Sequence, residues 1–278
     1  MEAATGTAPG RRITPDDIRR RKGGPPIVTL TAYTYPIARL LDPQCELLLV
    51  GDSVAMVLHG HKNTLGATIE MMVLHGQAVM RGSKLACVVV DLPAGSYETS
   101  VEQAVATARH IHGATGCSAV KLEGGVDVAG QIAAIVADGI PVMGHIGLQP
   151  QSVEKEGGYK IKGRSDDTIA ALYRDAEAVV RAGAFALVIE GTIEDVAAGI
   201  TRSVRIPTIG IGASADCDGQ ILVTDDALGL TVDRVPKFVK EYAQLRDVVS
   251  AAVETYADEV RNRTFPGEAH VFRNKGGR

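Results

Sequence analysis

Acidic side chains recur where short apolar runs of the sequence end, and carboxylates can bind metal ions or move protons. Asp52 and Ser53 follow the run LLLV, and Asp91, Glu123 and Glu190 end three later runs. A single Asp at such a point is usually explained as a helix cap or turn former. Because acids recur at equivalent points, capping alone is a poor explanation for all of them.

Three of these acids, Asp52, Asp91 and Glu123, are expected on consecutive strands, about 4.8 Å apart in a sheet. Carboxylates a few ångströms apart repel by about 1 kcal/mol per pair in water and by more where water is excluded. A bound cation is the simplest way to offset this repulsion. The prospective ligands are few and all are hard oxygens, which favours Mg²⁺ with water and substrate completing its shell.

Three further side chains are expected near these acids. Lys121 lies two residues before Glu123, so it shares that strand face and either pairs with an acid or binds a substrate carboxylate. His145 ends another run and is either a satisfied core histidine or part of the site. Glu190 ends a strand remote from that of Asp52, which makes it a candidate general base.

The elements that must position these residues are apolar runs alternating with segments of helical periodicity. The segment 99–113 has Ser100 as its expected cap, and the segment 167–183 has Gly183 as its stop. Strands that are apolar on both faces and alternate with helices pair in parallel through right-handed crossovers. The runs occupy residues 27–33, 47–53, 86–93, 119–125, 140–148, 186–191, 206–213 and 220–226.

Eight such units predict an α/β fold, the TIM (β/α)8 barrel, in which all strands end at the rim that carries the active site. An open doubly wound sheet is the alternative. No linker divides the 278 residues, so we expect one barrel domain over 1–278, with frayed tails at about 1–12 and 273–278. A helix capped by Thr14, with Pro15 in its first turn, should precede the first strand and close the bottom of the barrel.

Composition excludes several kinds of partner. The net charge of -4 gives no reason to expect a nucleic-acid partner, and no stretch is long and apolar enough for a membrane span or signal peptide. The four cysteines lack metal-ligand spacing, which indicates buried thiols in a reducing, cytoplasmic compartment. The segment GIGASA at 210–215 matches a dinucleotide-binding pattern weakly and is read as a tight turn or a phosphate loop.

Longer motifs in the same order resemble the ketopantoate hydroxymethyltransferase (3-methyl-2-oxobutanoate hydroxymethyltransferase) family over residues 14–272. The motifs are TLTAYTYP, LLVGDSVAMVLHGH, VVVDLPAGSYE, AVKLEGG, IPVMGHIGLQPQSV, GGYKIKGR, PTIGIGASADCDGQILV and FPGEAHVF. The sequence departs from the family's usual residues at Thr34, Ala94, Glu156 and Ser214. None of these departures falls on a candidate metal ligand or on the candidate base.

This resemblance implies a Mg²⁺-dependent TIM barrel of the phosphoenolpyruvate/pyruvate class. Such an enzyme transfers the one-carbon unit of methylenetetrahydrofolate to 3-methyl-2-oxobutanoate (α-ketoisovalerate). The product is 2-dehydropantoate (ketopantoate), which serves pantothenate and coenzyme A synthesis. The resemblance also implies a homo-oligomer, commonly a decamer.

Carried over residue by residue, the resemblance implies that Asp52 and Asp91 bind the metal, with Glu123 joining the metal shell directly or through water. Asp52, Ser53, Asp91 and Lys121 match positions that hold the keto acid, and Glu190 matches the catalytic base. We count His145, from the strand-end analysis, among the substrate-binding residues.

The expected mechanism begins with the keto acid chelating Mg²⁺. Glu190 then removes the C3 proton, and Mg²⁺ and Lys121 stabilise the enolate that attacks the folate-derived methylene. Two alternatives stay open. One is a Mg²⁺-dependent aldolase or lyase of the same barrel class that acts on another 2-oxo acid, and the other is a non-catalytic binding or scaffold barrel.

Overall fold

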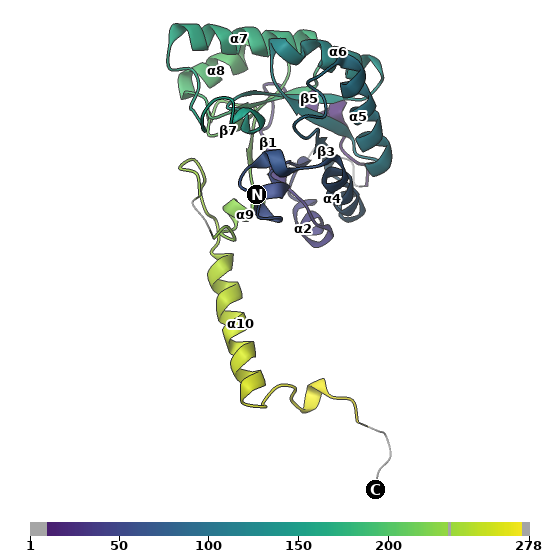
Figure 1. Cartoon of the computed structure of the whole chain (residues 1–278), viewed down its shortest axis with the longest axis vertical. Helices are drawn as coiled ribbons and strands as arrows, with labels where there is room; N and C mark the ends of the chain where they lie inside the picture. Colours follow the sequence, from purple (N-terminus) through teal and green to yellow (C-terminus); the bar gives the residue numbers. More distant parts are fainter. Residues whose placement is uncertain (1–9, 233–234, 274–278) are drawn as a thin grey trace. The chain divides into compact units, whose positions relative to one another are not determined.

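The computed structural model describes residues 10–232 and 235–273, and the chain divides into two compact units, 1–224 and 225–278. Within the described part of the first unit, eight parallel strands follow one another around a closed barrel (Figure 1). The TIM barrel predicted from the sequence is confirmed. The strands are β1 (Ile27–Thr31), β2 (Leu47–Val50), β3 (Cys87–Asp91), β4 (Ala119–Glu123), β5 (Val142–Gly147), β6 (Ala186–Glu190), β7 (Thr208–Ile211) and β8 (Gly219–Leu222).

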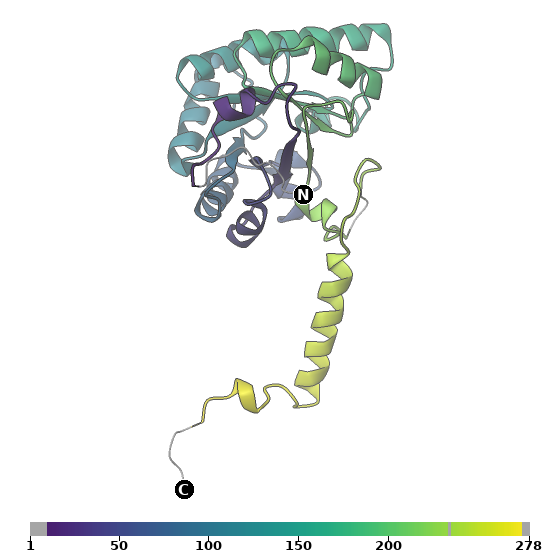
Figure 2. The ribbon, with the colours of Figure 1, turned by 180° about the vertical axis from the view of Figure 1, so that it is seen from behind.

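Helices cover the outside of the barrel, as the views from opposite sides show (Figures 1 and 2). Ser100 caps α5 by accepting a hydrogen bond from the Gln103 amide, and Gly183 follows α7 with a φ of 98°. Both predicted helices are confirmed. The helices of this unit are α1 (Pro15–Arg19), α2 (Tyr35–Leu41), α3 (Val54–Val57), α4 (Ile69–Gly82), α5 (Val101–Thr115), α6 (Ala129–Ala137), α7 (Asp166–Arg181) and α8 (Glu194–Ser203), with short 3₁₀ turns η1 (Thr64–Gly66), η2 (Val126–Val128) and η3 (Pro150–Ser152).

Alternate residues of each strand belong to two different cores. In β2, Leu48 and Val50 pack with residues of the surrounding helices, whereas Leu47 and Leu49 belong to a second cluster inside the barrel. This follows from the two-residue period of a strand, whose successive side chains point to opposite faces. The inner cluster also includes Ala119 of β4, so Lys121 and Glu123, in the same phase, continue along the inner face.

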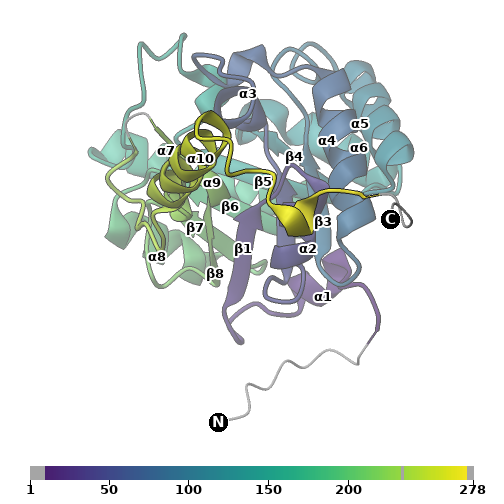
Figure 3. The same ribbon diagram turned by 90° about the horizontal axis from the view of Figure 1, so that it is seen from below.

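The predicted helix before the first strand is α1, which the chain positions at the bottom of the barrel. The Thr14 side chain accepts a hydrogen bond from the Asp17 amide, and Pro15 opens the helix. Ile18 is fully buried in the inner cluster, and Arg19 donates to the Gly183 carbonyl just ahead of β6. Figure 3 shows α1 and the strands from below.

Contacts near the chain ends add detail to the expected extent of the domain. Arg12, expected in a frayed tail, donates hydrogen bonds to the carbonyls of Ser83 and Ala86. The single domain expected over 1–278 stays a prediction. Residues 225–278 form a unit of their own, in which no residue of α10 (Leu245–Arg261) is buried, so α10 contributes nothing to a core. Residues 1–9 and 274–278, also expected to fray, lie outside the described residues.

The second unit contains α10 and the turn η4 (Glu268–His270), and α9 (Thr224–Ala227) spans the boundary between the units. Apolar side chains are exposed along one stripe of α10: Val249 at 52%, Val253 at 59%, Tyr256 at 56% and Val260 at 44%. Their spacing of four, three and four residues places them on one helix face. Among the described residues, no helix is long and apolar enough to span a membrane.

Candidate active site at the carboxyl ends of the strands

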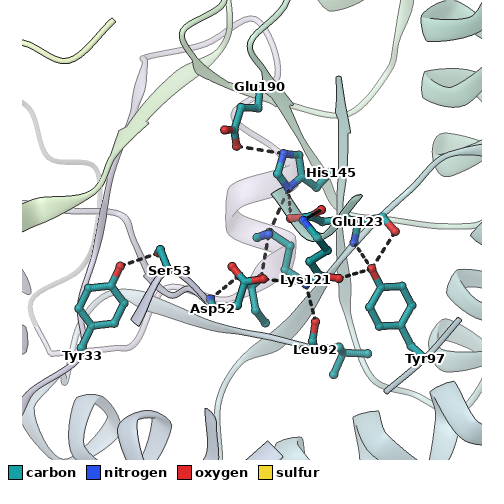
Figure 4. Close-up of polar contacts among 11 residues, drawn as sticks. Tyr33, Asp52, Ser53, Leu92, Tyr97, Lys121, Glu123, His145 and Glu190 are labelled. Carbon is teal, nitrogen blue, oxygen red and sulfur yellow. Dashed lines mark hydrogen bonds and ion pairs between the residues drawn. The ribbon is translucent and has the colours of Figure 1, made fainter. Parts of the chain in front are cut away.

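The predicted acids meet at one end of the barrel because their side chains lie on the inner faces of their strands. Asp91, Glu123 and Glu190 are the last residues of β3, β4 and β6, and His145 lies in β5 directly opposite Glu123. All four side chains have little or no access to solvent. The structure therefore brings together the residues selected from the sequence (Figure 4).

Asp52 joins this group through the backbone just after β2. Its amide donates to Asp91 Oδ2 over 3.0 Å, and its own Oδ2 accepts from Gln151 Nε2 over 2.8 Å. Asp52 therefore uses its hydrogen-bonding capacity inside the pocket, and it does not act as the helix cap that a lone strand-end Asp would suggest.

Lys121 forms the ion pair that was one of its two expected roles. Its Nζ lies 2.8 Å from Asp91 Oδ1, and both side chains are almost completely buried. Burial by itself lowers the pKa of Lys121, but the charges of Asp91, Glu123 and Asp52 outweigh it and raise that pKa. Lys121 is therefore an ammonium at neutral pH.

His145 links this ion pair to Glu190. Its Nδ1 is 3.3 Å from Lys121 Nζ, and its Nε2 is 3.3 Å from Glu190 Oε2. Burial, followed by the charge of Lys121, lowers the pKa of His145 well below its usual value. The imidazole is thus neutral, with Nδ1 able to accept from the ammonium and Nε2–H facing the carboxylate. The Nε2 contact lacks hydrogen-bond alignment, so it is an electrostatic contact.

The pocket holds more carboxyl groups than its cationic groups can balance. Burial raises the pKa of Asp52 to about 7, and the Asp91 charge adds to this shift. Burial and the Asp52 charge likewise raise the pKa of Glu123 well above its usual value. Among the described residues that meet here, Asp52, Asp91, Glu123 and Glu190 face one ammonium, that of Lys121.

A divalent cation would fit this arrangement. Asp91 Oδ1 is buried and has no aligned hydrogen bond despite its ion pair with Lys121, so a lone pair remains available. In the described part of the chain, no three His, Cys, Asp or Glu side chains converge as a ready metal cage. One or two carboxylates with water and substrate is the shell that Mg²⁺ commonly takes.

Ser53 directly precedes α3, but its side chain does not cap that helix. Its Oγ lies 2.7 Å from the hydroxyl of Tyr33, which follows β1. Figure 4 shows this pair beside Asp52. The Ser53 hydroxyl is thus held next to the acids and not at the helix end.

Two residues of the site were missed by sequence reasoning. Gln151, in η3, contacts Asp52 and Glu123, and Tyr97, in the loop after β3, contacts Gln151. Both are neutral and lie beyond the strand ends, so a search for charged strand-end groups passes over them. The available signal was their position in loops after β5 and β3, since the loops at this rim of a barrel build its active site.

The chain matches known proteins over nearly its whole length. A family model described as ketopantoate hydroxymethyltransferase matches residues 12–268. A 3-methyl-2-oxobutanoate hydroxymethyltransferase of Mesorhizobium japonicum is 75% identical over 261 residues, covering 94% of this chain and 91% of that protein. One of the same name from Rhizobium rhizogenes is 58% identical and covers 98% of this chain and 99% of that protein.

Solved structures with a similar fold have little sequence in common with this chain. Phosphonopyruvate hydrolase, in a complex with oxalate and Mg²⁺, superposes with a TM-score of 0.59 at 14% identity, covering 94% of this chain and 93% of that one. 2,3-Dimethylmalate lyase, a member of the PEP mutase/isocitrate lyase superfamily, gives 0.59 at 17% identity, covering 91% and 86%. At such identities these likenesses concern the fold alone.

Proposed function

The chain belongs to the ketopantoate hydroxymethyltransferase family and is an enzyme that hydroxymethylates 3-methyl-2-oxobutanoate, and we propose that its one-carbon donor is methylenetetrahydrofolate. The proposed product, 2-dehydropantoate, places the enzyme in pantothenate and coenzyme A synthesis. The resemblance carried by the sequence motifs supports the donor and the pathway.

One observation carries the proposed chemistry. Glu190 lies at the strand ends with 15% of its side chain exposed, and this partial burial raises the pKa of its carboxyl to about 7, although the Lys121 charge opposes the shift. A carboxylate with such a pKa can both take and release a proton near neutral pH. Its neighbour His145 is neutral, so it does not hold Glu190 in the ionised form by a full charge.

Mg²⁺ is the proposed cofactor. Asp52 and Asp91 would hold it, with Glu123 in its shell directly or through water; the supporting observations are the surplus of buried carboxylates and the available lone pair on Asp91 Oδ1. When bound, the ion would supply Lewis-acid stabilisation of negative charge that develops on the keto acid.

The side chains of the pocket have separate roles in this proposal. Glu190 takes the proton from C3 of the keto acid. The Lys121 ammonium, fixed by Asp91, adds positive charge near the developing negative charge. Ser53, positioned by the Tyr33 hydroxyl, and His145 contact the substrate and orient it.

The bond changes then balance. The pair of electrons left at C3 forms a bond to the methylene carbon, which in the donor bridges two folate nitrogens, and both of its bonds to nitrogen break. The two nitrogens take up the proton that leaves C3 and one proton from water. Water supplies the hydroxyl oxygen, so the products are 2-dehydropantoate and tetrahydrofolate. Because the proposed base and the proposed Mg²⁺ site lie at the same rim of the barrel, both substrates must meet there.

We further propose that the enzyme is a cytoplasmic homo-oligomer, with the decamer of the family resemblance as the expected size. Four cysteines in the described part of the chain are free and buried, which suits a reducing compartment. The exposed stripe Val249, Val253, Tyr256 and Val260 on α10 offers apolar surface that an assembly could cover. Light scattering of the purified protein tests the assembly, and a monomeric mass would contradict it.

The proposed reaction is tested with purified protein, 3-methyl-2-oxobutanoate, methylenetetrahydrofolate and Mg²⁺, with and without a chelator. We expect 2-dehydropantoate to form only with the folate donor and Mg²⁺. Activity on the keto acid without folate would favour an aldolase or lyase of the same barrel class. Binding of the keto acid without turnover would favour a non-catalytic barrel.

A further inference from the structure

Gln151 touches two of the acids through different parts of the same residue. Its side-chain Nε2 donates to Asp52 Oδ2 over 2.8 Å, and its main-chain N–H donates to Glu123 Oε2 over 3.0 Å. Asp52 follows β2 and Glu123 ends β4, with β3 between them. A single residue of the η3 turn thus spans the two carboxylates across the strand that carries Asp91.

The orientation of the Gln151 amide is determined by its partners. Nε2 donates to both Asp52 Oδ2 and the Leu92 carbonyl, which is 3.0 Å away. Both are acceptors, so a flipped amide would place its oxygen against two other oxygens. On the opposite side, the Tyr97 hydroxyl donates to Gln151 Oε1 over 2.6 Å.

Tyr97 is itself fixed by β4. The Glu123 amide donates to the Tyr97 oxygen over 3.2 Å. That leaves the single hydroxyl proton for Gln151 Oε1 at 2.6 Å rather than for the Glu123 carbonyl at 3.1 Å. The main chain of β4 therefore directs the tyrosine, the tyrosine directs the amide, and the amide holds Asp52. Figure 4 shows Tyr97 and Glu123 on one side of this chain of contacts and Asp52 on the other.

We propose that Gln151 is a positioning residue that holds Asp52 in the orientation needed to bind the metal, and that Tyr97 acts through Gln151. This inference rests on the proposed function, since it assigns Asp52 to the metal. The amide supplies directed N–H donors without adding charge to a pocket that already holds an excess of carboxylates. Hydrogen-bonding partners of metal ligands commonly have such a role, and their loss costs metal affinity.

The side chain and the main chain of Gln151 can be separated experimentally. Gln151→Leu and Gln151→Met remove the contact to Asp52, but the main-chain contact to Glu123 does not depend on the side chain. Tyr97→Phe removes one hydroxyl and keeps the ring. Matched controls are Gln77→Leu, which removes an amide bonded to the Ala114 carbonyl between two outer helices, and Tyr173→Phe, which removes a hydroxyl on α7.

The experiment measures the Mg²⁺ affinity of metal-free protein by calorimetry, together with the rate at which C3 of the keto acid exchanges its proton in deuterated solvent. Gln151→Leu should bind Mg²⁺ about tenfold more weakly than wild type, and Tyr97→Phe about threefold more weakly. The double variant should match Gln151→Leu alone, because Tyr97 acts through Gln151. The control variants should keep wild-type affinity.

A merely structural role predicts a different pattern. If Gln151 positions Asp52, about ten times more Mg²⁺ restores the exchange rate of Gln151→Leu, whereas damage to the fold is not restored by metal. Unchanged Mg²⁺ affinity in folded Gln151→Leu or Gln151→Met overturns the inference. Failure of added Mg²⁺ to restore the exchange rate also overturns it. If the losses of Mg²⁺ affinity in the two single variants multiply in the double variant, Tyr97 does not act through Gln151.

Failure of the inference and failure of the proposed function are distinguishable. If wild type forms 2-dehydropantoate and Gln151→Leu keeps its Mg²⁺ affinity, the positioning role falls and the function stands. If wild type binds Mg²⁺ but forms no product from the folate donor, the function falls, and the affinities still decide the role of Gln151. A wild-type protein that binds no Mg²⁺ overturns both.

Discussion

Glu190 and His145 show how the environment of a side chain, and not its type alone, decides what it can do. His145 is buried and Glu190 is largely so; this environment raises the pKa of Glu190 to about 7 and lowers that of His145 well below its usual value. Near neutral pH, Glu190 can therefore take up and release a proton while the His145 imidazole stays neutral.

Replacing Glu190 with Gln tests the assignment of the base. The substitution keeps the size of the side chain, so Mg²⁺ and keto acid should still bind. Exchange of the C3 proton with deuterated solvent, measured by NMR, should fall by at least about 100-fold, which is the low end of the contribution of a general base. Exchange near the wild-type rate would refute this role, and Glu194→Gln on α8 is the matched control for loss of a carboxylate.

The pH dependence of the same exchange reaction follows from the raised pKa of Glu190. A general base acts in its ionised form, so the rate should be low below the pKa, rise with pH through about 7, and level off above it. Saturating Mg²⁺ at every pH separates this effect from the metal binding proposed for Asp52, whose pKa burial also raises to about 7. A rate that does not change between about pH 5.5 and 8.5 would contradict the assignment.

Sequence reasoning at this scale recovered the candidate residues at the strand ends and missed Gln151 and Tyr97 in the loops beyond them. Asp91 and Glu123 could be found because a strand has a fixed phase and a fixed end. Gln151 and Tyr97 lie in loops after β5 and β3, where no period constrains the direction of a side chain. Their roles depend on hydrogen bonds across three strands, which only the assembled barrel specifies.

At the scale of elements, close contact between helices depends on small residues. Helices α2 and α4 lie side by side on the barrel (Figures 1 and 2). A Cβ atom added to Gly82, at the end of α4, would lie 2.6 Å from the Tyr35 carbonyl oxygen and 2.9 Å from Ala38 Cβ. Among the described residues, a Cβ atom added to Gly113, near the end of α5, would meet no atom within 4 Å apart from its chain neighbours and its own helix backbone.

These two glycines give opposite predictions for the same substitution. Gly82→Ala should lower the free energy of unfolding by about 1 to 3 kcal/mol, because the main chain of α2 must move away. Gly113→Ala should raise it by up to about 1 kcal/mol, because alanine favours the helix and meets no neighbour. Urea unfolding measures both, and equal effects of the two changes would show that helix contact at Gly82 does not limit stability.

The eight strands were predictable at this scale because each is a short apolar run bounded by turn-forming residues, and the barrel order follows from their alternation with helices. The extent of the barrel domain was harder to predict. The segment that forms α10 has regular helical spacing, yet none of its residues is buried. Periodicity reveals an apolar face without revealing what that face packs against.

At the scale of the whole molecule, Asp218 connects parts of the barrel that are far apart in the sequence. Its carboxylate accepts from the Gly23 amide over 2.8 Å, from the Thr208 amide over 2.8 Å and from Lys22 Nζ over 2.9 Å. It thereby joins the segment after α1 to β7 just before β8 closes onto β1. Burial acts to raise the pKa of Asp218, but these hydrogen bonds outweigh it and lower that pKa.

Asp218→Asn should therefore destabilise the protein by about 2 kcal/mol near pH 7, since hydrogen bonds to a charged group are lost. A carboxyl with a lowered folded pKa stabilises the fold above its unfolded pKa of about 3.9 and loses that contribution as pH falls through the folded value. The difference between variant and wild type should thus shrink as pH falls below about 4. Urea unfolding across this range measures it, with exposed Asp127→Asn as control; a constant difference would argue against the ionised carboxylate.

Alternate side chains of β4 serve the outer core and the active site, so correct folding of this strand also places active-site residues. Val120 and Leu122 belong to the outer core, whereas Lys121 and Glu123 are buried on the inner face. Deleting one residue from this strand would exchange the two sets, moving a lysine and a glutamate among the helices at a cost of several kcal/mol each. A wrongly phased strand would thus forfeit folding and catalysis together. In a scan of single-residue insertions and deletions within β4, variants that lose the yield of folded protein should therefore also lose activity.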